Sequence, residues 1–326
     1  MAPRDLIIDR PMPPPTVSQD APRLGRPDWI LLGTLALSWG SAFLLIKVAV
    51  AAFDPLTYVW LRLTFAAAAL ALFVRLSGRR LGLPLAVWAA VGLLALLNNV
   101  VPFLLFGWGQ RHIASGLAAI LQATTPIFGV VAAHFLTADE KITPARLIGV
   151  VIGFAGVATM IGPQIAGDGG SKLLAQVACL VASLMYALAG IFARRFKALG
   201  VPPIELAAAQ FVAGAVMLAP IALAFGQSLT ALPTSLTAWA AVVVLALVCS
   251  AYAYVLFFRL IETAGATNSM LVTLLVPPIA VTLGALVLGE FFGIAQIAGL
   301  MLIAAGLAII DGRLLKAWTA RPRPIV

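Results

Sequence analysis

Seven polar or aromatic side chains lie near the middle of long apolar segments in this sequence. These residues are Trp39, Asn98, Asn99, Gln122, Ser250, Tyr252 and Thr273. A polar group in the core of a bilayer is costly unless it is paired or faces an aqueous cavity. Amide and hydroxyl groups supply donors and acceptors without a fixed charge, so the set could replace the water around a polar or zwitterionic solute. Hydrogen bonding between helices is the alternative for each residue.

An aromatic pair, Trp39 and Tyr186, occupies corresponding positions in the two halves of the chain described below. Such a pair could form the wall or the gate of a solute site, and Tyr186 therefore joins the candidate binding residues. Packing against neighbouring helices is the alternative, because aromatic side chains are common in apolar cores.

Two cations, Lys47 and Arg62, also fall inside apolar segments. A buried cation could attract the carboxylate of a solute that enters or leaves. Lys47 is close enough to the end of its helix to reach the membrane surface, and Asp54 on the short connection could neutralise either charge. A charge-handling role and a structural role are both open for the two residues.

Prolines interrupt several apolar segments, among them Pro102, Pro126 and Pro277. A proline inside a helix removes a backbone hydrogen bond and bends the helix. We expect these three positions to be kinks, which either act as hinges or only shape the packing.

The residues needed for an intramembrane enzyme are scarce. The two histidines, His112 and His134, do not form a His-Glu-x-x-His motif, and the sequence has no Gly-x-Ser-x-Gly motif and no pair of carboxylates inside one apolar segment. A P-loop that could bind ATP is also missing. We expect neither catalysis nor a metal or cofactor.

The segments that carry these residues are typical of membrane-spanning helices. The composition is 62% hydrophobic and 10% charged, whereas soluble domains have roughly 25% charged residues. A spanning helix needs about 20 mainly apolar residues. The sequence predicts ten such helices, at residues 29–50, 55–74, 86–108, 113–136, 143–161, 173–193, 203–225, 238–258, 264–288 and 293–310.

The net charge of +9 follows from membrane topology and does not indicate nucleic-acid binding. Of the 21 Lys and Arg residues, 17 fall on the side of the N-terminus, and only Arg111 and Lys172 fall in the opposite loops. By the positive-inside rule both termini are cytoplasmic. We expect a multi-pass protein of the cell membrane, with a disordered proline-rich tail at 1–28 and a second tail at 312–326.

The two halves of the chain resemble each other. Pro126 matches Pro277 at an offset of 151 residues, and Glu140 matches Glu290 at 150. Other matched pairs are Trp39 with Tyr186, Lys47 with Arg194, and Arg62 with Gln210. The halves are residues 29–163 and 172–311. Each half holds five predicted helices, an odd number, so the halves have opposite orientations in the membrane, as in many secondary transporters.

Short motifs carry a resemblance to a known family. They are Trp39-Gly40-Ser41-Ala42-Phe43, Arg62-Leu63, Ser115-Gly116-Leu117-Ala118, Thr125-Pro126 and Leu288-Gly289-Glu290. With these motifs the sequence resembles the drug/metabolite transporter superfamily, in its EamA-like ten-helix branch. The resemblance implies ten helices around a central cavity and export of amino acids, their metabolites or drug-like compounds. The first copy of the Gly-Glu element departs from the pattern, since it reads Ala138-Asp139-Glu140.

The expected fold is an all-α integral membrane protein with two inverted five-helix repeats around a central cavity. The expected function is ATP-independent export of small metabolites, such as amino acids, by alternating access. A passive channel, a receptor-like protein and an intramembrane enzyme are the alternatives. The expected partners are a small-molecule substrate and the lipid bilayer, with a homodimer as a further possibility.

Overall fold

The computed structural model describes residues 25–137, 140–165, 170–269 and 271–312. Most of the expected N-terminal tail, the motif positions 138 and 139, and the expected tail after residue 312 lie outside the described residues. The described chain is helical and has no strand. Its α-helices are α1 (Arg26–Ala52), α2 (Pro55–Leu76), α3 (Leu85–Ala95), α4 (Val101–Gly109), α5 (Ser115–Gln122), α6 (Thr125–Leu136), α7 (Pro144–Ile165), α8 (Gly170–Ala198), α9 (Pro203–Phe225), α10 (Leu236–Ala246), α11 (Ala253–Ser269), α12 (Val272–Leu288) and α13 (Ile294–Asp311).

Two π-helical turns and one short 3₁₀ turn complete the fold. The turn η1 (Leu96–Val100) joins α3 to α4, and η3 (Leu247–Tyr252) joins α10 to α11. Each therefore lies inside one long helical segment rather than between two helices. The 3₁₀ turn η2 (Leu229–Ala231) lies in the connection from α9 to α10.

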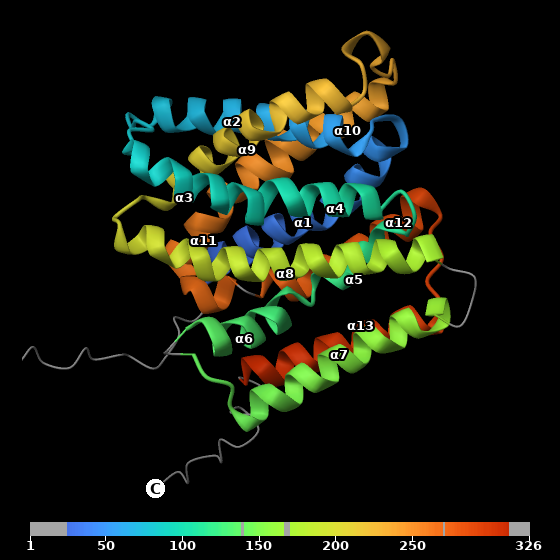
Figure 1. Cartoon of the computed structure of the whole chain (residues 1–326). Helices are drawn as coiled ribbons and strands as arrows, with labels where there is room; N and C mark the ends of the chain where they lie inside the picture. The colour runs from blue at the N-terminus through green and yellow to red at the C-terminus, as the bar shows by residue number, and fades with distance from the viewer. Residues whose placement is uncertain (1–24, 138–139, 166–169, 270, 313–326) are drawn as a thin grey trace, which may run out of the picture.

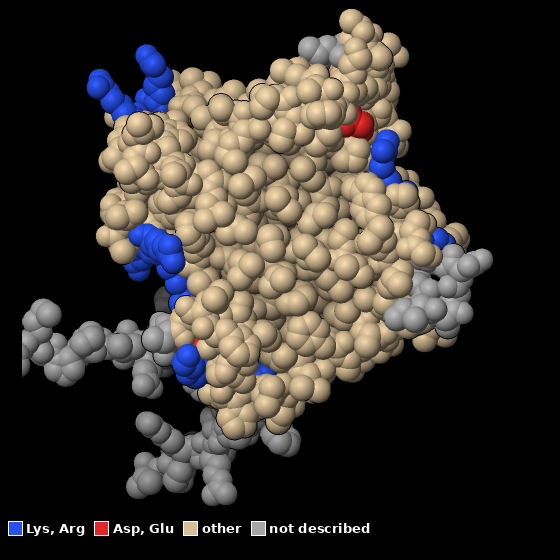
Figure 2. Space-filling view, viewed as in Figure 1, with Lys and Arg blue, Asp and Glu red and all other residues tan. Residues whose placement is uncertain are grey.

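The helices are long and apolar enough for a membrane protein, as the sequence predicts. Nine helical segments in the described part of the chain have the length and hydropathy needed to cross a bilayer, and α12 is a shorter apolar helix of 17 residues. The middle of the face shown in Figure 2 is almost free of charged side chains, while Lys and Arg gather mainly at one edge. This chain is a multi-pass membrane protein.

Local sequence explains where several helices begin and end. The Asp54 side chain accepts hydrogen bonds from the backbone N–H of Leu56 and Thr57 and so caps α2, whose first residue is Pro55. Gly289 ends α12 in the left-handed conformation, with φ of 65°, which favours glycine. We call the side of the molecule that holds the α1–α2 connection the Asp54 end, and the side with the α2–α3 connection the Arg79 end.

The helices pack in pairs that join the first five predicted spans to the last five. The closest pairs are α2 with α9, α1 with α12, α4 with α8, and α7 with α13. Figure 1 shows α7 and α13 side by side at one edge of the bundle and α2 and α9 near the other, with α1, α4, α8 and α12 between them. Residues far apart in sequence therefore meet in the interior.

Glycines permit the closest of these approaches. A Cβ atom added to Gly306 on α13 would lie 2.5 Å from the carbonyl oxygen of Gly149 on α7. One added to Gly156 would lie 2.7 Å from the carbonyl oxygen of Gly299. Small residues allow backbones to approach in this way inside membranes, so α7 and α13 form one tightly packed pair.

Three predicted helices differ in detail from those observed. The predicted helix at 113–136 is broken after Gln122 and resumes at Thr125. The helix predicted at 238–258 continues as far as Gly265, where φ is 80° and the chain leaves the helical conformation. The helix predicted at 86–108 contains the π-helical turn η1. The sequence does not predict this turn, because the segment is almost entirely apolar and has no periodic pattern.

Candidate functional site

The first polar group in the interior is centred on Asn98. This residue lies on η1, and its side-chain N–H group donates hydrogen bonds of 2.9 Å to the Gln210 side-chain oxygen and 2.9 Å to the Tyr254 hydroxyl. The acceptors belong to α9 and α11. The amide of Asn98 therefore connects the first half of the chain to two helices of the second half. We call Asn98, Gln210 and Tyr254 the Asn98 group.

The second polar group is centred on Arg62 of α2, which is only 5% exposed. Its Nε donates to the Ser250 hydroxyl over 3.1 Å, and its guanidinium lies 3.8 Å from the centre of the Phe103 ring. Ser250 in turn donates to the Leu245 carbonyl oxygen over 2.9 Å. Arg62, Ser250 and Phe103 form the Arg62 group, which also joins the two halves.

Both groups depend on a π-helical turn. A π-turn makes i to i+5 hydrogen bonds and is frequent at functional sites in helices. The turn η1 carries Asn98 and Asn99, and η3 carries Ser250. The Val248 carbonyl oxygen of η3 also accepts a hydrogen bond from the Ser38 hydroxyl of α1, over 3.2 Å.

Asn99 is completely buried beside Asn98 on η1. Neither its side-chain oxygen nor its side-chain nitrogen has a hydrogen-bond partner in the described structure. A buried polar group without a partner loses the free energy of its hydration. Asn99 therefore has hydrogen-bonding capacity to offer to a bound molecule.

Aromatic rings from both halves lie beside these groups. The Trp39 ring packs against Phe257 with the ring centres 5.3 Å apart, and the Tyr186 ring stacks on Phe106 at 6.1 Å. Each contact joins the first helix of one half to the third span of the other. The structure thus pairs each of the two predicted aromatic residues with a ring that the sequence argument did not single out.

The other three predicted binding residues do not share these hydrogen bonds. Gln122 is the half-buried last residue of α5, and its carbonyl oxygen accepts from Thr125 over 2.7 Å. Thr273 is half-buried in the first turn of α12. Tyr252 is 51% exposed, and Tyr254, two residues further along, contributes the hydroxyl to the Asn98 group instead.

The predicted prolines occupy three different positions. Pro102 lies in the first turn of α4, directly after η1, and Pro126 lies in the first turn of α6, directly after the break in that segment. Pro277 lies inside α12.

At the Asp54 end, Glu290 follows α12 and makes several polar contacts. Its carboxylate accepts hydrogen bonds from the Ser115 backbone N–H at 2.7 Å, the Ser115 hydroxyl at 2.9 Å and the Gly116 N–H at 3.2 Å. These donors form the start of α5, where a negative charge is favourable. We call this set the Glu290 contact.

Lys47 is held close to the Glu290 contact. Its half-buried ammonium donates to the carbonyl oxygens of Gln110 and Ile113, the latter over 2.9 Å. The charge of Glu290 is near enough to act on it. Lys47 therefore binds the connection between α4 and α5.

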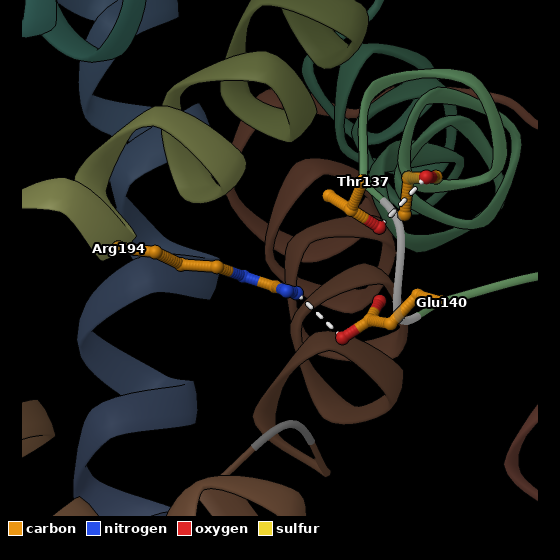
Figure 3. A network of polar contacts seen from close by, with 4 residues as sticks. Thr137, Glu140 and Arg194 are labelled. Atoms are coloured by element: carbon orange, nitrogen blue, oxygen red, sulfur yellow. Dashed lines mark hydrogen bonds and ion pairs between the residues drawn. The ribbon is translucent and has the colours of Figure 1, made fainter.

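An ion pair lies at the Arg79 end, between Arg194 of α8 and Glu140, which follows α6. The Arg194 guanidinium and the Glu140 carboxylate are 2.7 Å apart, and the side chains are 49% and 40% exposed. Figure 3 shows Arg194 reaching across from its helix to Glu140. Exposed ion pairs contribute roughly 0–1 kcal/mol, so this contact is weaker than the Glu290 contact.

A cavity of about 360 Å³ lies at the same end, between α2, α9 and α11. Its lining includes Arg79, Arg259 and Glu262, together with apolar side chains such as Val255 and Phe258. No group of three or more metal-ligating side chains occurs in the described residues.

Comparison with known proteins identifies the family. The model of the EamA-like transporter family matches residues 28–162 and again residues 173–311. The chain belongs to the EamA-like transporter family. This assignment confirms the resemblance carried by the short motifs.

Relatives of this EamA-like chain are named as transporters. The "Uncharacterized inner membrane transporter YedA" of Escherichia coli (strain K12) is 30% identical over 268 residues, covering 79% of this chain and 82% of the relative. The "Probable terminal-alkyne amino-acid exporter" of Streptantibioticus cattleyicolor is 28% identical over 299 residues, covering 90% and 96%. The "Uncharacterized transporter YoaV" of Bacillus subtilis is 27% identical over 284 residues, covering 85% and 95%. The EamA-like chain is a transporter and not an enzyme.

A solved structure has the same fold. It is described as "Crystal structure of protein", superposes with a TM-score of 0.63, and covers 89% of this chain and 98% of its own, at 20% sequence identity. At this identity the likeness establishes the fold of the EamA-like chain alone.

Proposed function

We propose that this transporter exports small metabolites, such as amino acids or related compounds, by alternating access between two inverted five-helix halves. Ten helices span the membrane, with α12 as part of the ninth span. The observation that carries the proposal is the position of the Asn98 and Arg62 groups, which lie in the apolar interior and are each shared between the halves. Solute sites of inverted-repeat transporters lie at such an interface.

The inverted repeat is supported by contacts that recur under the sequence offset. Trp39 packs against Phe257, and Tyr186 packs against Phe106. Exchanging the halves turns the first contact into the second, since Trp39 corresponds to Tyr186 and Phe106 to Phe257. The two π-turns also correspond, and the family model matches each half separately.

The contacts at the two ends support alternating access. Glu290 and Glu140 occupy matched positions, yet the first accepts three hydrogen bonds at the Asp54 end and the second forms one exposed ion pair at the Arg79 end. The cavity also lies at the Arg79 end. This arrangement fits a conformation closed at the Asp54 end, and strengthening one contact while weakening the other would reverse it.

The distribution of charge supports a cytoplasmic Arg79 end and cytoplasmic termini. The described helices begin with Arg26 and finish with Asp311 at the end where most Lys and Arg residues gather. Positive residues favour the cytoplasmic side of a membrane. The Asp54 end would then face the outside. The conformation that is closed at this end would be open to the cytoplasm, from which an exported solute binds.

The substrate class is supported by two observations. The binding groups in the interior are amides, hydroxyls and one guanidinium, which suit a solute with polar and ionised groups. In addition, one relative bears the name of a probable amino-acid exporter.

Transport of a labelled panel from proteoliposomes tests the function. The panel comprises amino acids, nucleosides and cationic drugs, each measured with and without unlabelled solute on the opposite side. We expect saturable efflux of amino acids that is accelerated by solute in trans. A flux that neither saturates nor responds to solute in trans would indicate a channel, and no flux of any solute from folded protein would refute the proposal.

A further inference from the structure

Arg62 is a buried cation without an acidic partner among the described residues. The guanidinium is always charged, and no described carboxylate lies within 4.0 Å of it. Asp54, on the same side of the membrane, is bound by the N–H groups of Leu56 and Thr57 and by that of Gln227 over 2.7 Å. Glu290 is occupied by the start of α5. Neither acid is therefore available to neutralise Arg62.

The surroundings of Arg62 fix the orientation of its guanidinium. One face lies against Phe103, and the Nε donor is bound to Ser250. Ser250 directs its own proton to the Leu245 carbonyl oxygen, so that the hydroxyl oxygen can only accept from Arg62. A guanidinium held in this way loses little conformational freedom when it binds a ligand.

The terminal nitrogens of Arg62 have binding capacity left. Neither makes a hydrogen bond of normal geometry to a described residue, although the buried Tyr58 hydroxyl lies beside the guanidinium and also lacks a partner of normal geometry. Two nitrogens of one guanidinium form a fork that matches the two oxygens of a carboxylate. The Tyr58 hydroxyl could donate to the same carboxylate.

The matched position in the second half carries no charge. Gln210 corresponds to Arg62 and, as a neutral amide, accepts from Asn98. The interior therefore has a cation on one side and neutral amides on the other. An anionic group in a medium of low polarity needs such a cation, because burial of an unpaired carboxylate is strongly unfavourable.

We propose that the Arg62 guanidinium binds the carboxylate of the transported solute through two parallel hydrogen bonds. The substrates are then solutes with a free carboxylate, and the corresponding amides and amines bind poorly. This inference rests on the transport function proposed above, but it concerns recognition and can be tested without measuring flux.

Ligand binding to the purified protein tests the inference. The unfolding temperature of the full chain in detergent would be measured in the presence of each of the common L-amino acids. The same measurement would be made with the amino-acid amide, in which the α-carboxylate is replaced by a primary amide. We expect at least one acid to raise the unfolding temperature, and its amide to bind about 10–100-fold more weakly, as the loss of hydrogen bonds to a charged group implies. In Arg62→Met this preference for the acid should vanish, and Arg62→Lys should retain only part of it because lysine lacks the fork.

A matched control separates this role from a structural one. Arg75 lies on the same helix but is exposed near the Arg79 end, and Arg75→Gln should bind the acids as the wild type does. We also expect unliganded Arg62→Met to unfold at or above the wild-type temperature, because removal of an unpaired buried charge is not destabilising.

Three outcomes would overturn the inference. They are equal binding of acids and amides by the wild type, no binding of any acid, and an unchanged preference for acids in Arg62→Met. Binding of acids without any flux would instead support the recognition site and contradict the transport function, so the two proposals fail in different ways.

Discussion

The Glu290→Gln substitution should open the Asp54 end. The carboxylate accepts three hydrogen bonds from Ser115 and Gly116, at 2.7, 2.9 and 3.2 Å. A hydrogen bond to a charged group contributes about 1.5–3 kcal/mol. The amide retains one accepting oxygen but loses the charge and the second acceptor. We estimate that the closed state loses about 2–3 kcal/mol, which shifts the ratio of open to closed protein by about 30–150-fold.

A native cysteine can report this shift. Cys249 lies on η3 next to Ser250 and is 2% exposed, with its sulfur 3.9 Å from the Ser41 hydroxyl. With the other cysteine removed by Cys179→Ala, a membrane-impermeant maleimide would be added to sealed vesicles that expose the Asp54 end. The labelling rate of Cys249 should be low in the wild type and rise by about 30–150-fold in Glu290→Gln.

The control is Glu262→Gln, which removes an exposed carboxylate at the Arg79 end and should leave the labelling rate unchanged. If Glu290→Gln folds normally and Cys249 is labelled at the wild-type rate, then the Glu290 contact caps α5 without controlling access, and the reasoning is wrong.

Four further substitutions test the remaining features. Asn98→Leu should lower the initial rate of efflux from proteoliposomes at least about tenfold, because each buried acceptor left unpaired costs about 1–3 kcal/mol. Tyr252→Ala should leave that rate within about twofold, since the side chain is 51% exposed, whereas Tyr254→Phe should lower it by removing one bond of the Asn98 group. Gly306→Ala should reduce the free energy of unfolding by about 1–3 kcal/mol, measured by thermal denaturation, because its Cβ would lie 2.5 Å from the Gly149 carbonyl oxygen.

The positions of most helices follow from the sequence because a bilayer requires long apolar segments. Segments 55–74 and 203–225 correspond closely to α2 and α9. The π-turns could not be predicted in the same way. A π-turn needs one additional residue in a helix, and in a uniformly apolar segment no periodic pattern shows where that residue is accommodated.

The sequence also predicted part of the candidate site. Asn98 and Ser250 could be predicted because each is a polar side chain inside a long apolar segment. The structure places Asn98 in the Asn98 group and Ser250 in the Arg62 group. Tyr252 and Tyr254 could not be distinguished, because lipid and protein interior are both apolar and hydrophobicity does not reveal the rotation of the helix. Gln210 had a signal, since it matches Arg62 under the repeat, but on its own it is a single amide in an apolar segment.

The two π-turns also bear on the history of the gene. Leu96 begins η1 and Leu247 begins η3, at the same offset of 151 residues that relates Pro126 to Pro277. Under the proposed duplication, the additional residue was already present in the ancestral five-helix protein before its gene was copied. That ancestor would have paired with a second, oppositely oriented copy of itself, and each copy would have contributed one widened turn. Fusion into one chain then allowed Arg62 and Gln210 to diverge, which an assembly of identical subunits does not permit.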